Sequence, residues 1–436
     1  MVDLVVIGGG LAGATAALEA KHQGLSVVLA ARSWGATALS TGALDAAYSP
    51  ALSPDQDLPR SVADHVKDIT AHRPRHPYGV LGFERSTRAL RDGFARVAPA
   101  LQAQGLVLGG LETERENHLL PSSLGTFMPA ASAASAHLGG PLAAGAEATG
   151  AWGVLQLAGE QQLDATRVAA GLAHDARALT GKNLRFEPLF TSVRAARAPV
   201  ATARMLDDTA EIRHLAAAIR PQARDLAGLI VPPVIGLRRH RQALLELQEQ
   251  LGLPVVEALA HVPSVPGLRL QMALDAALRA AEIPILPEIE QVHVRDRRVA
   301  AVAMANGEEV RPRAVTLATG RFIAGGVGWR GETLTESLLG LPVSSELGLL
   351  EENSPHPVVR QDPEESHPLM TAGVMVNERL QPMQEGVVAF DNVFAAGMVI
   401  GGFASRYVLC ADGVALSTGV LSARAAVEHV ASAAAA

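Results

Sequence analysis

Cysteine is nearly absent from this chain, which has one among its 436 residues, Cys410. A single cysteine excludes an intrachain disulfide framework, a C-x-x-C redox pair and an iron–sulfur cluster held by cysteines of this chain alone. Such scarcity is typical of a protein that works in a reducing compartment, so we expect a cytoplasmic location.

A surplus of basic residues is also missing, because the formal net charge is −7. General nucleic-acid-binding proteins carry a basic face, so this balance argues against that class. No uninterrupted apolar run reaches the roughly 18 residues that suggest a transmembrane helix, and the first residues lack the basic segment of a signal peptide. We therefore expect no transmembrane segment, with any membrane contact made through partners.

Aromatic residues are few, at 3%, whereas 48% of the residues are hydrophobic. This composition predicts a globular protein with cores of alanine, valine and leucine, long enough for two or more structural units. No histidine pair has metal-ligand spacing and no G-x-S-x-G elbow occurs. We therefore expect neither a metal site nor a serine nucleophile.

The chain opens with an apolar run that ends at Ile7 and breaks into glycines before an alanine-rich helical pattern. Three of these glycines have the G-x-G-x-x-G spacing of a dinucleotide-binding βαβ unit. The first permits the turn, the second lets the backbone approach a pyrophosphate, and the third lets the helix pack on the strand. Because helix N-termini bind phosphate, we expect cofactor-binding residues at Gly8, Gly9, Gly10, Leu11, Ala12 and Gly13.

A second buried strand is expected over residues 26–30. In a standard FAD or NAD site, an acidic residue at the end of this strand binds the adenosine ribose. Here Ala30 and Ala31 occupy the corresponding positions, which argues against NAD. Arg32 follows as a candidate phosphate ligand, although a solvated side chain is the commoner role for such an arginine.

Small and hydroxyl-bearing residues follow in the loop 35–45. Ser40, Thr41 and Gly42 suit a backbone that lies against a ring or a phosphate, so we include them among the candidate cofactor-binding residues. An ordinary surface loop is equally compatible with this composition.

The remaining pattern predicts an α/β fold in which a Rossmann-like FAD/NAD(P)-binding domain is built from the N- and C-terminal segments. We expect its first part at 1–149 and its second part, with a C-terminal helix, at 266–436. Alternating strands and helices between them predict an inserted α/β unit at 150–265 that serves as a substrate cap or a docking unit. Residues 73–78 are too rich in proline for a regular element.

Two later strands that end in glycine also indicate a nucleotide-binding site. A buried strand ends in Ala318-Thr319-Gly320, where a larger side chain would clash with a bound nucleotide. A second short strand ends in an Ala-Ala-Gly segment before a last helix from about residue 412. The N-terminus of that helix could donate N–H groups to a ring edge. These segments add the candidate cofactor-binding residues Ala318, Thr319, Gly320, Gly397, Met398, Asp412 and Gly413.

Together these motifs resemble the flavoproteins of the fumarate reductase and glycerol-phosphate dehydrogenase type. Within that superfamily the chain is most similar to the B-type subunits of anaerobic glycerol-3-phosphate dehydrogenase. The similar stretches span nearly the whole chain and are Ser40–Asp45, His76–Gly82, Leu124–Thr126, Pro263–Leu270, Leu317–Gly326 and Gly397–Phe403. The resemblance implies a subunit of a membrane-associated complex that oxidises sn-glycerol 3-phosphate to dihydroxyacetone phosphate and passes electrons to quinone.

The resemblance also implies partners: a larger FAD-bearing catalytic subunit and an iron–sulfur, membrane-anchoring subunit at the inner face of the cell membrane. It implies FMN on this subunit, whereas the full G-x-G-x-x-G predicts the pyrophosphate of FAD. The acid that usually follows the Ala-x-Gly segment is replaced by Met398. FAD, FMN and a vacant ancestral pocket therefore stay open, and so do a non-catalytic relay or docking role and a stand-alone flavin dehydrogenase.

No residue stands out as catalytic. Oxidation of a phosphorylated alcohol on a flavin needs a base for the hydroxyl and cations for the phosphate. The candidate bases are His76, His118 and His261, for each of which a structural role is commoner. Arg269 and Arg321 are candidate anion ligands because neighbouring glycine or proline turns would aim them inward, and Cys410 most resembles a packed small residue.

Overall fold

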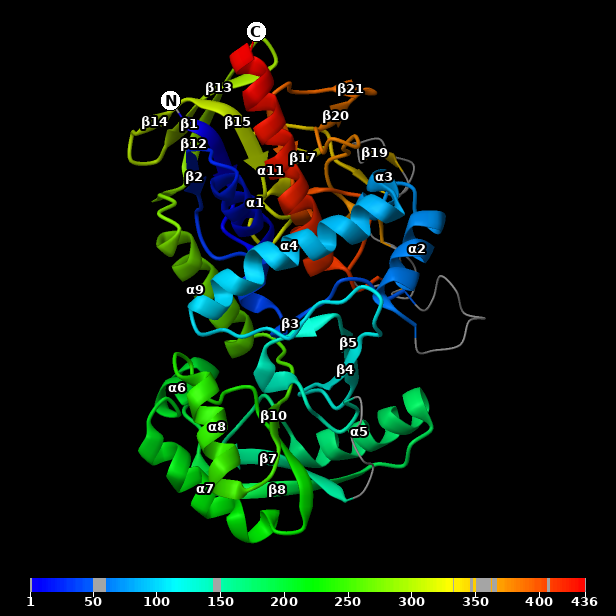
Figure 1. The fold of residues 1–436 in the computed structure, drawn as a ribbon, viewed down its shortest axis with the longest axis vertical. Helices are drawn as coiled ribbons and strands as arrows, with labels where there is room; N and C mark the ends of the chain where they lie inside the picture. Colours follow the sequence, from blue (N-terminus) through cyan, green and yellow to red (C-terminus); the bar gives the residue numbers. More distant parts are fainter. Residues whose placement is uncertain are drawn as a thin grey trace.

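The computed structural model describes residues 2–49, 60–143, 150–331, 333–345, 348–349, 362, 367–405 and 408–435. They form two lobes, each built around a parallel sheet with helices (Figure 1). Both ends of the chain lie at the top of the upper lobe in this view. The α/β fold class is confirmed.

The upper sheet has the strand order β11 (Ile285–Leu286), β2 (Val27–Ala30), β1 (Val2–Ile7), β15 (Pro312–Leu317) and β22 (Val393–Ala395), all parallel. The first strand of the chain thus lies between the second strand and one that begins about 300 residues later. Because parallel strands end at the same edge, the chain leaves all five strands toward one side of the lobe.

Alternate residues of β1 serve two different cores, as expected of a strand buried on both faces. Leu4 and Val6 pack against the helices α1 (Leu11–His22), α4 (Phe83–Ala103), α9 (Val265–Ala280) and α11 (Ala411–Ala435). Val5 and Ile7 pack against the three-stranded sheet of β12 (Ile289–Arg295), β13 (Arg298–Met304) and β14 (Glu309–Val310). Helices therefore cover one face of the sheet and a small antiparallel sheet covers the other.

Two of the glycines after β1 stand where other backbone atoms come too close for a side chain. A Cβ atom on Gly13 would lie 1.8 Å from the carbonyl oxygen of Gly8, so α1 packs on the strand exit without room for a side chain. Gly8 itself has φ +117° and its Cβ would lie 2.2 Å from the carbonyl oxygen of Ala318 at the end of β15. Only glycine satisfies both constraints.

The lower sheet has the order β10 (Val255–Glu257), β9 (Leu226–Val231), β7 (Ala151–Ala158) and β8 (Arg185–Arg194), again parallel. One face packs on α5 (Ala165–Thr180) through a core that includes Trp152 and Leu172. The other face packs on α6 (Pro199–Met205), α7 (Thr209–Ala223) and α8 (His240–Leu251).

Short elements complete the described part of the chain. The helices are α2 (Val62–His72), α3 (Pro77–Leu81) and α10 (Pro368–Thr371), with 3-10 turns at Ala36–Leu39, Ser135–His137 and Gly397–Val399. The strands are β3 (Ala43–Leu44), β4 (His118–Pro121), β5 (Phe127–Ala130), β6 (Ser132–Ala133), β16 (Val327–Arg330), β17 (Thr333–Glu336), β18 (Ser344–Ser345), β19 (Gly348–Leu349), β20 (Met383–Gln384) and β21 (Val387–Val388). The β4–β5 hairpin lies between the two lobes (Figure 1).

Local structure departs from the sequence prediction in two places. The segment 73–78 was expected to be irregular, yet α3 begins at Pro77, because proline suits the first position of a helix. Ser264 caps a 16-residue helix, α9, where the prediction had a turn beside Arg269. The domain boundaries at 149/150 and 265/266 stay predictions, and residues 144–149 lie outside the described residues.

A buried ion pair links α9 of the upper lobe to β10 of the lower sheet. The Arg269 guanidinium donates to both carboxylate oxygens of Glu257, with N···O distances of 2.6 and 2.9 Å. It also donates to the carbonyl oxygens of Ile235 and Gly236, and the Ile235 N–H donates to Glu257. Arg269 therefore has its charge and most of its donors satisfied inside the protein.

Removing one residue of the Arg269–Glu257 pair should destabilise the folded protein. We expect Glu257→Ala to lower the free energy of unfolding by about 3–5 kcal/mol, because an unpaired guanidinium is left buried. The double variant Glu257→Leu/Arg269→Met should recover much of this loss in urea denaturation. Glu112→Ala, which removes the exposed pair with Arg115, is the control and should change stability little. Equal losses for Glu257→Ala and Glu112→Ala would contradict the role of burial.

Candidate functional site

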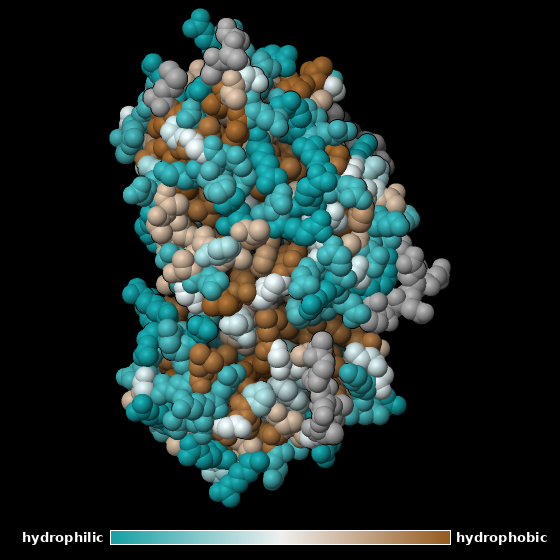
Figure 2. All heavy atoms as spheres, in the orientation of Figure 1, coloured by the Kyte–Doolittle hydropathy of each residue, from teal (hydrophilic) through white to brown (hydrophobic). Residues whose placement is uncertain are grey.

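A cavity of about 780 Å³ opens at the carboxyl edge of the upper sheet, where β1, β2 and β15 end. Its wall includes the glycine turn after β1, the loop 31–41, the loop 318–326 and the start of α11. Met128 and Leu259, next to the lower sheet, close one side of it. Figure 2 shows hydrophobic residues gathered across the middle of the molecule, between the lobes.

Most of the predicted cofactor-binding residues line this cavity. They are Gly8, Gly9, Gly10, Leu11, Ala12, Arg32, Ser40, Thr41, Ala318, Thr319, Gly320, Met398 and Asp412. Segments far apart in the sequence are thus brought together at one site, and their role in cofactor binding stays a prediction.

Four predicted glycines lie behind the wall and permit close packing instead. A Cβ atom on Gly13 would meet the Gly8 backbone, one on Gly42 would lie 2.3 Å from Pro266, and one on Gly397 would lie 2.6 Å from Ala12. At Gly413 the Cβ would lie 2.3 Å from the Tyr78 hydroxyl. These glycines shape the cavity indirectly, by letting its walls approach one another.

Thr37 is a cavity residue that sequence reasoning missed. Its hydroxyl oxygen accepts the Leu11 N–H at 3.0 Å, at the first turn of α1. N–H groups of a first helical turn lack acceptors within the helix and carry the positive end of its dipole. Thr37 therefore contacts the helix end that was predicted to bind phosphate. The feature of the sequence that could have indicated this role is its position in a hydroxyl-rich loop.

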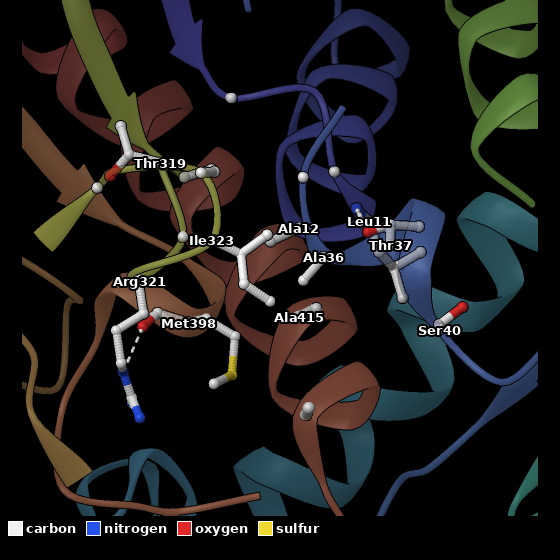
Figure 3. Close-up of a pocket in the computed structure, with 18 of the residues that line it drawn as sticks. Leu11, Ala12, Ala36, Thr37, Ser40, Thr319, Arg321, Ile323, Met398 and Ala415 are labelled. Carbon is white, nitrogen blue, oxygen red and sulfur yellow. Dashed lines mark hydrogen bonds between the residues drawn. The ribbon is translucent and has the colours of Figure 1, made fainter. Parts of the chain in front are cut away.

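Two cavity residues carry buried hydroxyl groups without a hydrogen-bond partner among the described residues, Ser40 and Thr319. In Figure 3 they lie on opposite sides of the site, with Ile323 and Ala36 between them in the view. Buried polar groups are nearly always paired in native proteins. The glycine cradle after β1, where Gly8, Gly9 and Gly10 line the cavity without side chains, fits a polar nucleotide such as a flavin.

At the end of β2, Arg32 points to solvent and forms an ion pair with Glu288, with 3.4 Å between Nε and Oε1. Both residues line the cavity. The two positions directly after β2 carry no acid, as the sequence predicted, because Ala31 and Arg32 stand there in the cavity wall. A carboxylate is nevertheless present there, supplied by the chain after β11.

At the opposite end, two carboxylates meet where α11 begins. Asp45 Oδ1 accepts the Asp412 N–H at 2.7 Å, and Asp412 Oδ2 accepts the Asp45 N–H at 3.3 Å. Both residues line the cavity. Burial raises the pKa of Asp45 to about 6, and burial with the charge of Asp45 raises the pKa of Asp412 well above its ordinary value. Burial therefore favours the protonated form of both carboxyl groups.

His76 lies outside the cavity wall and is buried. Its Nδ1 accepts the Tyr78 N–H at 2.9 Å, while Nε2 lies 3.3 Å from the Cys410 sulfur. Burial lowers the pKa of His76 to about 3, so the ring is neutral. This position argues against His76 as the substrate base and makes it a helix cap that packs on Cys410.

The two candidate arginines are both held by the protein. Arg269 is in the buried pair with Glu257, away from the cavity. Arg321 lines the cavity, but its guanidinium donates to the carbonyl oxygens of Met370, Met398, Ile400 and Phe403. Figure 3 shows the bond to Met398. Arg321 therefore clamps the chain around Met398 to the loop after β15.

The other candidate bases lie elsewhere. His118 is at the start of β4, and His261 Nδ1 lies 2.9 Å from the Ser123 hydroxyl oxygen. Neither lines the cavity. Over the described parts of the chain, no group of three or more His, Cys, Asp or Glu side chains is arranged to hold a metal ion. Asp45, at the end of the stretch Ser40–Asp45, is a further cavity residue that the sequence did not mark as a site residue.

The sequence comparisons agree with the geometry. Residues 3–414 match the family model described as FAD binding domain. The chain belongs to this family. A flavin is therefore the cofactor that both the family and the cavity support.

Curated relatives of this FAD-binding-domain protein match nearly its whole length. It is 28% identical to the B-type subunit of anaerobic glycerol-3-phosphate dehydrogenase from Pectobacterium atrosepticum over 429 residues, covering 95% of this chain and 96% of the relative. It is 26% identical to the subunit of the same name from Yersinia pestis over 448 residues, covering 98% and 99%. The predicted resemblance to this subunit is confirmed.

Among solved structures, the open conformation of a flavocytochrome c3 fumarate reductase aligns with a TM-score of 0.42 and 11% identity, covering 98% of this FAD-binding-domain chain and 78% of that one. Within the described residues, no helix combines the length and the hydropathy needed to cross a membrane.

The buried carboxylate pair predicts a pH-dependent stability. Because the folded-state pKa of Asp45 is raised from 3.8 to about 6, its protonated form is favoured by folding. This contribution is fully present below pH 3.8 and is lost as pH rises through 6. We expect Asp45→Asn to be more stable than wild type at pH 7.5, by on the order of 2 kcal/mol, and to approach it at pH 4.

Urea denaturation midpoints at the two pH values measure this difference. Asp225→Asn replaces an exposed carboxylate and is the control. Its difference in stability between pH 7.5 and pH 4 should equal that of wild type. A loss of stability in Asp45→Asn that is the same at both pH values would contradict a raised pKa.

Proposed function

We propose that this chain is the flavin-bearing B-type subunit of a membrane-associated complex that oxidises sn-glycerol 3-phosphate to dihydroxyacetone phosphate and passes the electrons to quinone. The observation that carries this proposal is the cavity that joins the G-x-G-x-x-G turn, the Ala318–Gly320 exit and the start of α11. The names of the relatives over at least 95% of this chain support the substrate and the subunit role.

The flavin we propose is FAD rather than FMN. The cavity extends from the carboxylate pair at α11 to Arg32 and Glu288 beyond the end of β2. In a dinucleotide fold, the end of the second strand is where the adenosine ribose binds. FMN has no adenosine and would leave that end of the cavity unused.

When bound, the flavin supplies a ring that accepts a hydride. The protein's own contribution lies in position and charge. The first turn of α1 and Thr37 would hold phosphate oxygens, and the glycine turn after β1 would let the cofactor approach the backbone. The N-terminus of α11 would direct its positive end toward the ring.

A second candidate function is an electron relay that does not oxidise the substrate itself. The arginines that line the described cavity are Arg32 and Arg321, and the Arg321 donors are already directed at carbonyl oxygens. None of the candidate histidines lines it. These features favour substrate oxidation on a larger FAD-bearing subunit, with this chain passing electrons toward an iron–sulfur, membrane-anchoring subunit at the cytoplasmic face.

Replacement of Gly10 should remove the flavin while preserving the fold. A Cβ on Gly10 would meet one neighbour within 4 Å, the Thr37 hydroxyl at 3.1 Å. The backbone of Gly10 is extended, so valine can adopt its conformation, and the Thr37 hydroxyl has to shift only slightly. We expect Gly10→Val to lower flavin affinity by on the order of 10-fold or more, because the side chain enters the cavity.

Flavin content from visible absorbance and folding from circular dichroism test this expectation. Gly110→Val, at an exposed loop position with one distant neighbour, is the control and should keep the flavin. A yellow, folded Gly10→Val protein with wild-type flavin content would argue against a flavin in this cavity. A colourless wild-type protein that cannot be reconstituted with FAD or FMN would overturn the proposed function.

Anaerobic reduction separates the two candidate functions. Mixed with sn-glycerol 3-phosphate and no partner subunit, the flavin of this chain should bleach slowly or not at all. The reason is that Arg321 is engaged by carbonyl oxygens and none of the candidate histidines lines the described cavity wall. Dithionite should bleach the flavin fully. Rapid bleaching by the substrate alone would show that this chain is itself the dehydrogenase.

A further inference from the structure

The carboxylate that dinucleotide folds place after the second strand is absent here, because Ala31 and Arg32 follow β2. The neighbouring strand β11 supplies a carboxylate at this place because of its register with β2. β11 pairs in parallel with β2, with Leu286 opposite Ala30, and the Ala31 N–H donates to the Leu286 carbonyl oxygen at 3.2 Å. Two residues beyond this last pair, Glu288 lies next to Arg32.

Two contacts hold Glu288 in place. Its carbonyl oxygen accepts the Ala305 N–H at 2.9 Å, which ties the backbone to the end of β13. Its carboxylate lies 3.4 Å from Arg32 Nε. The side chain is half-exposed, so two charges in this pair gain little stability from each other. A purely structural ion pair is therefore a weak reason for a carboxylate on this wall.

Glu288 is also set apart by its place in the cavity. The acidic residues that line the described cavity are Asp45, Asp412 and Glu288. The first two are bonded to each other at the start of α11, whereas Glu288 lies beyond the ends of β2 and β11. It is thus the acidic group on the described wall at the end where the second strand of a dinucleotide fold meets the ribose.

We propose that Glu288 is the ribose-binding residue of this protein: its carboxylate accepts hydrogen bonds from the 2′- and 3′-hydroxyls of the adenosine ribose of FAD. This inference rests on the proposed function and adds to it the residue that selects FAD over FMN. Arg32 is a positioning residue that holds the carboxylate at the rim. The negative charge also disfavours a ribose that carries a 2′-phosphate.

Binding to the flavin-free full-length protein tests this assignment. FAD and FMN are titrated separately, and flavin fluorescence quenching gives the dissociation constants. Glu288→Ala should weaken FAD binding by on the order of 10- to 100-fold, as expected for charge-assisted hydrogen bonds, and should leave FMN binding unchanged. Glu290→Gln, which changes an exposed acid two residues along the chain, is the matched control and should bind both flavins as wild type does.

A second ligand locates the contact. FAD that carries 2′-deoxyadenosine should bind wild type more weakly than FAD, and Glu288→Ala should bind the two equally. If wild type prefers FAD and Glu288→Ala retains that preference in full, the assignment is overturned while the flavin function stands. If wild type binds FMN as tightly as FAD, the assignment is overturned in the same way. If wild type binds neither flavin, the proposed function fails together with it.

Discussion

The close approach of α1 to the exits of β1 and β15 is the constraint on which the site depends. A side chain on Gly13 would run into the Gly8 carbonyl oxygen, and one on Gly8 would run into that of Ala318. With glycine at both positions, the first turn of α1 and the end of β15 border the same cavity. The glycine turn at the start of the chain and Thr319, more than 300 residues later, thereby line one cavity.

The charges around this cavity are unevenly arranged. One end holds the buried carboxyl groups of Asp45 and Asp412, whose pKa values are raised because the hydrogen bonds at the start of α11 do not replace the lost hydration. The other end holds the exposed pair of Arg32 and Glu288. Arg321, also on the cavity wall, directs its donors at backbone carbonyl oxygens. Its pKa is lowered by burial to about 10, so it stays charged at neutral pH.

Several features of the site could be predicted from local sequence. The glycine spacing after Ile7 predicted the strand, the turn and the helix, because each glycine has its own backbone requirement. Thr37 and Glu288 could not be predicted in this way. Thr37 reaches the site because a loop folds back on the start of α1. Glu288 reaches it because β11 pairs with β2 in one particular register. Arg269 was misplaced since a Ser264 cap and Pro266 start a helix rather than a turn.

The sequence by itself determined the fold class, the nucleotide turn and the family, because these depend on local backbone requirements and on motifs in a set order. It also determined that an acid is missing after the second strand. Only the tertiary structure decided which charged residues face the cavity. His76 and Arg269 are buried outside the cavity wall, and the donors of Arg321 are bonded to carbonyl oxygens. The register between β11 and β2 places Glu288 beside the position where the second strand lacks a carboxylate.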